Sequence, residues 1–196
     1  MGKLSFYYGV MGAGKSEELI KIYHNYERIN RSVVAFTFKE DLRDFNENSN
    51  GGINVPEINI ASRVGVKIPA FPFDNETDFI KDNDFEASVL IVDEGQFLTN
   101  QQVIDLTFLA DSGTDVLVFG LKNDFMNNLF EGSKALIEQA DKLIEMKTLC
   151  AFCGKKAIMN ARYVNGKQVY KGEQKLIGDE EYKGVCRSHW WAQANN

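Results

Sequence analysis

The chain has 196 residues, and 22 Lys and Arg against 28 Asp and Glu give it a formal net charge of −6. Its hydrophobic fraction of 44% is typical of globular domains and excludes a wholly disordered chain. This length allows one or at most two compact units, and no run approaches the ~18 apolar residues of a membrane span. We therefore expect a cytoplasmic protein without a membrane partner, and the acidic balance argues against a nucleic-acid partner.

The order of apolar runs predicts an α/β fold. The run Leu4–Tyr8 precedes a glycine-rich loop, and Ser16–Asn30 then carries one apolar stripe at helical spacing. Runs of this kind, with helical segments between them, are typical of a parallel sheet flanked by helices. Three further buried strands are predicted at Ser32–Phe38, Ser88–Val92 and Val116–Leu121.

Three other segments bear on the organisation of the chain. Asp41–Glu57 has no period that could bury a face, and we expect a mobile loop. Asp74–Glu86 holds six acids and one Lys and is interpreted as a solvated helix face. From Ala140 onward the pattern changes to glycine-rich short segments. We therefore predict one domain at residues 1–145 and a second, small domain of strands and loops at 146–196.

A phosphate-binding pattern follows the first predicted strand. Residues 9–16 read Gly-Val-Met-Gly-Ala-Gly-Lys-Ser and match G-x-x-x-x-G-K-[ST]. The backbone N–H groups of such a loop cradle phosphates, while Lys15 would reach the β- and γ-phosphates and Ser16 would bind Mg²⁺. The alternative is a glycine turn that happens to precede Lys and Ser. The expected ATP-binding residues here are Gly9, Met11, Gly12, Ala13, Gly14, Lys15 and Ser16.

Two carboxylates, Asp93 and Glu94, directly follow the predicted strand Ser88–Val92. Open α/β sheets bind their ligands at the carboxyl ends of the strands. Because successive strand residues point to opposite faces, Asp93 can approach Mg²⁺ while Glu94 faces an acceptor. The alternative is an ordinary surface turn. With the phosphate loop, the pair predicts nucleoside triphosphate chemistry and leaves open whether water or a substrate hydroxyl receives the γ-phosphoryl group.

Cysteine and histidine residues form two pairs with metal-ligand spacing near the end of the sequence. Cys150-x-x-Cys153 and Cys186-x-x-His189 supply three thiolates and one imidazole, the ligand set of a closed structural zinc site. The 32 residues between the pairs are more than compact DNA-binding fingers use, which indicates that this loop is itself functional. The alternative is three buried thiols and a surface histidine.

The order of these motifs resembles the zinc-containing (type II) thymidine kinases of animal cytosol, bacteria and large phages. The resemblance runs from the first strand to His189 and includes Met11 in the phosphate loop, the D-E-x-Q-F segment at residues 93–97, and GLKNDFMNNLF at 120–130. It also includes a zinc-tethered lasso that ends in Tyr182 before the last ligand pair. It implies a P-loop (RecA-like) parallel sheet flanked by helices, plus a small zinc-ribbon or lasso domain.

The resemblance also implies roles for single residues. Glu94 is the expected general base on the 5′-hydroxyl, Asp93 belongs with Mg²⁺, and Gln96 lies between the nucleotide and the deoxyribose. Lasso backbone around residues 159–161 and 176–178 is expected to hydrogen-bond the base edge. The implied thymine and sugar pocket consists of Met11, Gln96, Phe97, Leu121, Phe125, Phe130 and Tyr182.

The activity implied is transfer of the γ-phosphoryl group of ATP to thymidine or deoxyuridine in pyrimidine deoxynucleotide salvage. ATP, Mg²⁺ and structural Zn²⁺ are the implied cofactors, dTTP a feedback inhibitor, and a homotetramer the assembly. This chain departs from the family pattern by a lasso one residue shorter and by C-x-x-H in place of the last C-x-x-C. Two alternatives remain: a P-loop ATPase whose zinc unit binds nucleic acid, with Glu94 activating water, and a non-catalytic nucleotide switch.

Overall fold

The computed structural model describes residues 2–39, 58–62, 65–81, 87–174 and 181–192, which form two sheets and their covering helices. The larger sheet contains β1 (Leu4–Gly9), β2 (Val33–Phe38), β3 (Ile58–Ala61), β4 (Lys67–Phe73), β5 (Val89–Val92), β6 (Asp115–Leu121) and β7 (Lys142–Met146). The smaller contains β8 (Met159–Val164), β9 (Lys167–Val169) and β10 (Glu181–Val185). The helices are α1 (Lys15–Arg28), the 3-10 turn η2 (Gly95–Phe97), α2 (Asn100–Asp111), α3 (Glu131–Gln139) and α4 (Arg187–Ala192).

The larger sheet has the strand order β3-β4-β2-β5-β6-β1-β7. All of its neighbouring strands are parallel except β3 and β4, which are antiparallel. The predicted α/β class is therefore confirmed, with a mixed sheet in place of a purely parallel one. Because β1, β6 and β5 are parallel neighbours, the phosphate loop after β1 and the carboxylates after β5 lie at the same edge of the sheet.

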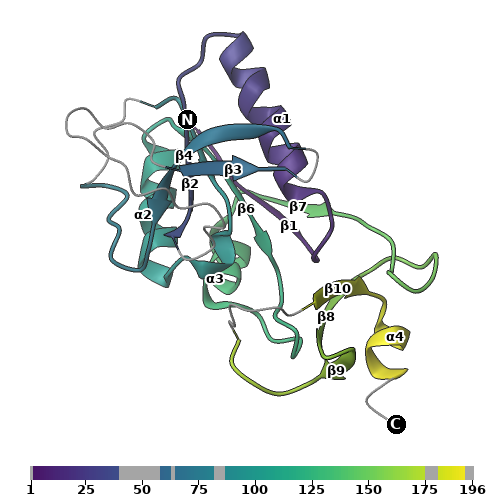
Figure 1. The fold of residues 1–196 in the computed structure, drawn as a ribbon. Helices are drawn as coiled ribbons and strands as arrows, with labels where there is room; N and C mark the ends of the chain where they lie inside the picture. The colour runs from purple at the N-terminus through teal and green to yellow at the C-terminus, as the bar shows by residue number, and fades with distance from the viewer. Residues whose placement is uncertain (1, 40–57, 63–64, 82–86, 175–180, 193–196) are drawn as a thin grey trace.

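Helices cover both faces of this sheet (Figure 1). On one face α1 buries Leu19, Ile20 and Tyr23 against the strands. On the other face α2 and α3 contribute to a second apolar cluster, to which Leu106 and Leu136 belong. A sheet covered on both faces needs strands that are apolar on both sides, and all four residues of β5 are buried. Among the described residues no helix is long and apolar enough to cross a bilayer.

All four predicted strands of the parallel core are present, each within one residue of its predicted ends. The predicted helix ends two residues early, at Arg28, because Asn30 turns into the left-handed region with φ 57°. Three strands of the larger sheet were not predicted: β3, β4 and β7. The prolines Pro69 and Pro72 of β4 argue against a strand in the sequence. Each of them lies where β4 pairs with a single neighbour, β3 for Pro69 and β2 for Pro72.

The predicted helix face at Asp74–Glu86 is wrong for its described part, residues 74–81, which forms turns. The Asp74 carboxylate accepts hydrogen bonds from the Glu76 N–H and the Thr77 hydroxyl, and Asp78 accepts from the Lys81 N–H. Asp and Thr side chains that bond nearby backbone in this way favour turns over helix. The predicted mobile loop at Asp41–Glu57 lies outside the described residues.

The smaller sheet, with strand order β10-β8-β9, forms the predicted second unit together with α4. Figure 1 shows this unit at one end of the larger sheet. It has an apolar cluster of its own, which includes Met159, Val185 and Trp190. The predicted domain boundary between residues 145 and 146 falls inside β7, before its last residue Met146, and stays a prediction.

Gly132, in the first turn of α3, tests how closely this helix packs on η2. A Cβ at Gly132 would lie 2.6 Å from the carbonyl oxygens of Gly95 and Leu98. In an open helix Gly132→Ala would stabilise the protein by about 1 kcal/mol, but we expect overpacking to cost about 1–3 kcal/mol instead. Thermal unfolding should show a Tm lowered by several degrees. Gly154→Ala is the control, because an added Cβ there would meet no atom within 4 Å among the described residues other than its chain neighbours. Equal Tm values for both variants would contradict the packing.

Candidate functional site

The phosphate loop has the backbone shape that anion binding needs. Its five residues between β1 and α1 include Gly12 and Gly14, with φ of 75° and 73°. The Ala13 N–H donates to the Val10 carbonyl oxygen at 3.2 Å, and the Lys15 ammonium donates to the same oxygen at 3.3 Å. Gly14 is the N-cap of α1, and glycine has no side chain that could cap the first turn. The N–H groups of that turn therefore face the loop as potential phosphate donors.

The acidic pair is held by a strained turn at the end of β5. The buried Asp93 donates its N–H to Phe36 O at 2.8 Å, and its Oδ1 accepts the Glu94 N–H at 3.0 Å. Glu94 has φ 55° and ψ 34°, the left-handed region that non-glycine residues seldom occupy. Strain of this kind persists only where surrounding contacts impose it, and it is found disproportionately at functional sites.

Gln96 connects Glu94 to the end of β6. Its side chain is 2% exposed; Nε2 donates to Glu94 Oε2, and Oε1 accepts the Leu121 N–H at 2.9 Å. A backbone N–H can only donate, so Oε1 must face Leu121 and Nε2 must face Glu94. This bond holds the Glu94 carboxylate as an acceptor. The sequence placed Gln96 between the nucleotide and the sugar and did not reveal its contact with Glu94.

A cavity of about 380 Å³ lies beside these elements. Residues 11–17 form one part of its wall, together with Asp93 and Glu94. The other part comes from residues 58–62 of β3 and the turn after it, and from Lys67 of β4. No motif marks this second wall, which reaches the phosphate loop only through the tertiary fold. The structure therefore brings the predicted phosphate loop and acidic pair together around one space.

Most residues of the predicted apolar pocket lie outside the described lining of this cavity. The Phe97 and Phe130 rings contact each other at 5.8 Å between centroids, next to Gln96 in η2. Phe125 is 1% exposed and lies under the Arg162 guanidinium, 4.5 Å from its ring centroid. Leu121, at the end of β6, and Tyr182, in β10, are half-buried. The described lining of the 380 Å³ cavity includes Met11 but not these five residues, so their binding role stays a prediction.

The expected lasso contacts fall in two places. Residues 159–161 lie in β8, where Met159, Asn160 and Ala161 are buried. Residues 176–178 lie outside the described residues.

Cys150, Cys153, Cys186 and His189 form one cluster in the smaller unit, with their ligand atoms all within 4.8 Å of one another. The His189 Nδ1 lies 3.5 Å from Cys150 Sγ and 3.3 Å from Cys186 Sγ, and the Cys153 and Cys186 sulfurs are 3.9 Å apart. Tetrahedral zinc with bonds to sulfur of about 2.3 Å separates two sulfurs by about 3.8 Å. The spacing therefore fits a closed four-ligand site.

The electrostatics of the cluster favour the thiolate at Cys150 and Cys186. Burial raises the pKa of the Cys150 thiol, but hydrogen bonds from the backbone of Cys186 and Phe152 outweigh it and lower that pKa to about 6. A hydrogen bond from the His189 backbone lowers the pKa of Cys186, and the bond to the Cys186 sulfur raises the pKa of the His189 imidazole. At Cys153 a hydrogen bond from the Lys155 backbone lowers the pKa, but burial and hydrogen bonds to the other two sulfurs outweigh it and raise that pKa. Thiolate is the form that binds zinc, so the chemistry of the donor set also fits this metal.

Comparisons with known proteins agree with the geometry. A family model described as thymidine kinase matches residues 2–190. The thymidine kinase of Lactiplantibacillus plantarum is 44% identical, with 97% of this chain and 96% of the relative covered. A thymidine kinase of Streptococcus pyogenes is 43% identical over 97% of this chain and 98% of the relative, and that of Enterococcus faecalis 43% identical over 97% and 95%. The resemblance drawn from the motifs is confirmed.

Proposed function

The chain belongs to the thymidine kinase family, and we propose that it transfers the γ-phosphoryl group of ATP to the 5′-hydroxyl of thymidine, or of deoxyuridine, in deoxynucleotide salvage. The observation that carries this proposal is the placement of Glu94 in the wall of the cavity that the phosphate loop also lines. A carboxylate held as an acceptor beside a triphosphate site can take the proton of an attacking hydroxyl.

The nucleotide half of the site would be built from residues 11–16. The N–H groups at the start of α1 and the Lys15 ammonium stabilise the negative charge of the phosphates. Ser16 and Asp93 line the same cavity and offer a hydroxyl and a carboxylate, the hard oxygen ligands that Mg²⁺ prefers. A magnesium ion bound there would neutralise charge on the β- and γ-phosphates.

The acceptor half depends on Glu94. Its Oε2 is engaged by Gln96 Nε2, which leaves Oε1 to take the proton. As the 5′-oxygen forms its bond to the γ-phosphorus, the bond from that phosphorus to the β–γ bridging oxygen breaks and ADP leaves. Leu121 lies at the end of β6, and its N–H donates to Gln96, the residue that engages Glu94. This position near the proposed base supports our assignment of the predicted apolar pocket residues to the nucleoside. A P-loop ATPase or a nucleotide switch would have no use for such a set.

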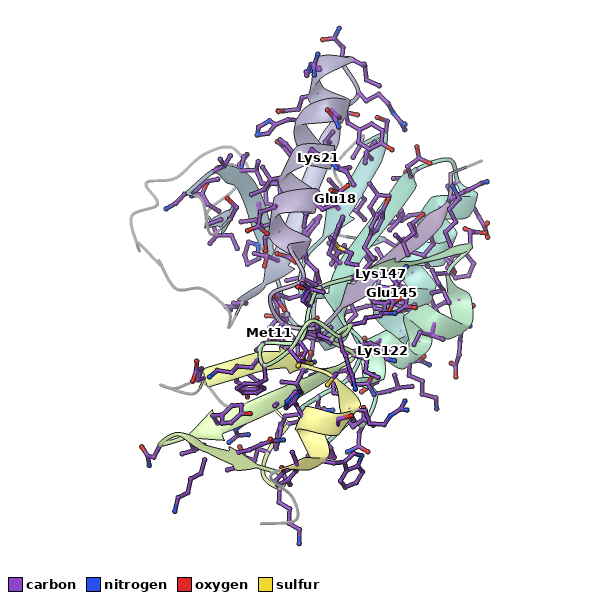
Figure 2. The ribbon with its side chains drawn as sticks, turned by 90° about the vertical axis from the view of Figure 1, so that its right-hand side faces the viewer. Met11, Glu18, Lys21, Lys122, Glu145 and Lys147 are labelled. Carbon is purple, nitrogen blue, oxygen red and sulfur yellow. The ribbon has the colours of Figure 1, made fainter. Side chains whose placement is uncertain are left out.

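Replacing Glu94 by Gln tests the base. Glu94→Gln should lower turnover by roughly 10²–10⁴-fold, because the amide cannot accept the proton, while thymidine still binds. The control is Glu18→Gln: Glu18 pairs with Lys21 at 2.5 Å on α1 (Figure 2), and Glu18 does not line the cavity. ADP formation with and without nucleoside, together with calorimetric titration of thymidine, checks both points. Near-normal turnover of Glu94→Gln would remove the assignment, and ADP release independent of nucleoside would favour an ATPase.

The Cys and His cluster is proposed to hold one structural zinc ion per chain. Metal analysis of protein purified without added metal should give about one zinc, and His189→Ala should lower that content. His24→Ala is the matched control, because His24 is the other histidine of the chain and instead contacts Glu27 on α1.

Zinc removal should act on the smaller unit first. That unit has its own apolar cluster, so chelation should speed amide exchange in β8 and β10 before the larger sheet is affected. Unfolding of the whole chelated chain in a single step would contradict this order.

Feedback inhibition by dTTP is also proposed. The base would occupy the thymidine site and the phosphates would lie back across residues 12–16, so one ligand would fill both half-sites and gain affinity through effective concentration. Lys15→Ala should therefore weaken dTTP far more than thymidine, whereas Lys21→Ala on the outside of α1 should change neither. Calorimetric titration of both ligands measures this difference, and equal losses for the two in Lys15→Ala would place dTTP elsewhere.

A homotetrameric, cytoplasmic enzyme completes the proposal. Its support is the family resemblance, and one structural feature agrees with it: β7 forms an edge of the larger sheet and carries the half-exposed Leu143. Edge strands with exposed apolar side chains are suited to contacts between subunits.

A further inference from the structure

Asn160, in the middle of the smaller unit, is bonded directly to the phosphate loop. Its Oδ1 accepts the Met11 N–H at 2.8 Å, and its Nδ2 donates to the Asn123 carbonyl oxygen at 2.7 Å. The side chain is 2% exposed, and both partners are backbone groups, so its orientation is determined. The Met11 N–H therefore points into the smaller unit, and that unit fixes the conformation of the loop at its third residue.

A second strand of the smaller unit touches the same place. Gly184 of β10 is the register partner of Asn160 in β8. A Cβ at Gly184 would lie 2.8 Å from the Met11 carbonyl oxygen and 2.9 Å from Val10 Cγ2. Figure 2 shows Met11 where the larger sheet meets β10. Both sides of the Met11 backbone are thus held, the N–H by Asn160 and the carbonyl by close contact with Gly184.

A residue next to each proposed pair of zinc ligands is hydrogen-bonded to Asn160 or to Gly184. Trp190 directly follows His189, and its Nε1 donates to the Asn160 carbonyl oxygen at 3.2 Å. Ala151, next to Cys150, donates its N–H to Gly184 O at 2.9 Å. Both ligand pairs are therefore connected to the Asn160 and Gly184 contact through backbone and a buried indole.

We propose that Asn160 is a positioning residue for the phosphate loop, through which zinc binding and nucleotide binding strengthen each other; this rests on the proposed zinc and ATP sites. With zinc bound, β8 and β10 are ordered and Asn160 holds the Met11 N–H, so residues 12–16 are pre-organised for phosphate. Without zinc, the nucleotide must order the loop and the smaller unit itself, which costs part of its binding free energy. Because such coupling is reciprocal, bound nucleotide must also retain zinc.

The test is an equilibrium competition for zinc against a zinc-selective chromophoric chelator, with and without saturating ADP. ADP should lower the zinc dissociation constant of the wild-type protein about 5-fold or more, at the lower end of usual coupling between sites. In Asn160→Ala, ADP should no longer change that constant. The matched control is Tyr170→Phe, which removes the bond from Tyr170 to Trp190 O at 3.0 Å within the same unit without touching the loop. ADP should lower its zinc dissociation constant by the wild-type factor.

Calorimetric titration of ADP keeps the outcomes separate. ADP that binds the wild-type protein without lowering its zinc dissociation constant overturns the inference alone, and so does an ADP effect that persists in Asn160→Ala. Absence of ADP binding would overturn the proposed function and this inference with it. The wild-type comparison needs no variant, so it decides the matter even if Asn160→Ala does not fold.

Discussion

The candidate site depends on the register of β6 between β1 and β5. Gly9, the last residue of β1, is opposite Leu121, whereas Val92, the last residue of β5, is opposite Val118. The end of β6 therefore continues past β5, beside the turn that carries the acidic pair. This overhang offers the Leu121 N–H to Gln96, and at Gly120 a Cβ would lie only 2.8 Å from Gln96 Oε1. A register shifted by one residue would separate Gln96 from its partner and release Glu94.

Strain and hydrogen bonding are balanced around Glu94. Its left-handed backbone costs about 1–3 kcal/mol on usual values, and bonds to Asp93 and Gln96 hold it there. Leu121 is held as well, because its carbonyl oxygen accepts the Ser133 hydroxyl of α3. The carboxylate is thus positioned by groups from β5, β6 and η2, which are rigid elements of the core. Such support is what a general base needs to meet a hydroxyl at a defined distance.

Specific polar bonds from buried side chains join the smaller unit to the larger one. Asn160 bonds the phosphate loop, and the Trp190 indole bonds the Phe125 carbonyl oxygen as well as Asn160. The Arg162 guanidinium lies on the Phe125 ring, so the smaller unit also covers this residue of the predicted acceptor pocket. Because an unpaired buried polar group costs about 1–3 kcal/mol, these bonds favour one arrangement of the two units.

The sequence by itself determined the family. It also contains, as short motifs, the residues on which the proposed chemistry rests: the phosphate loop, the acidic pair and the proposed metal ligands. It also determined the central strands, because runs such as residues 89–92 are apolar on both faces. It did not reveal β4, whose prolines are tolerated because each lies where β4 pairs with a single neighbouring strand. It also did not reveal the turns at residues 74–81. The bonds from Leu121 to Gln96 and from Met11 to Asn160 were decided by tertiary structure alone, since these pairs are 25 and 149 residues apart and no local pattern encodes a hydrogen bond across such a separation.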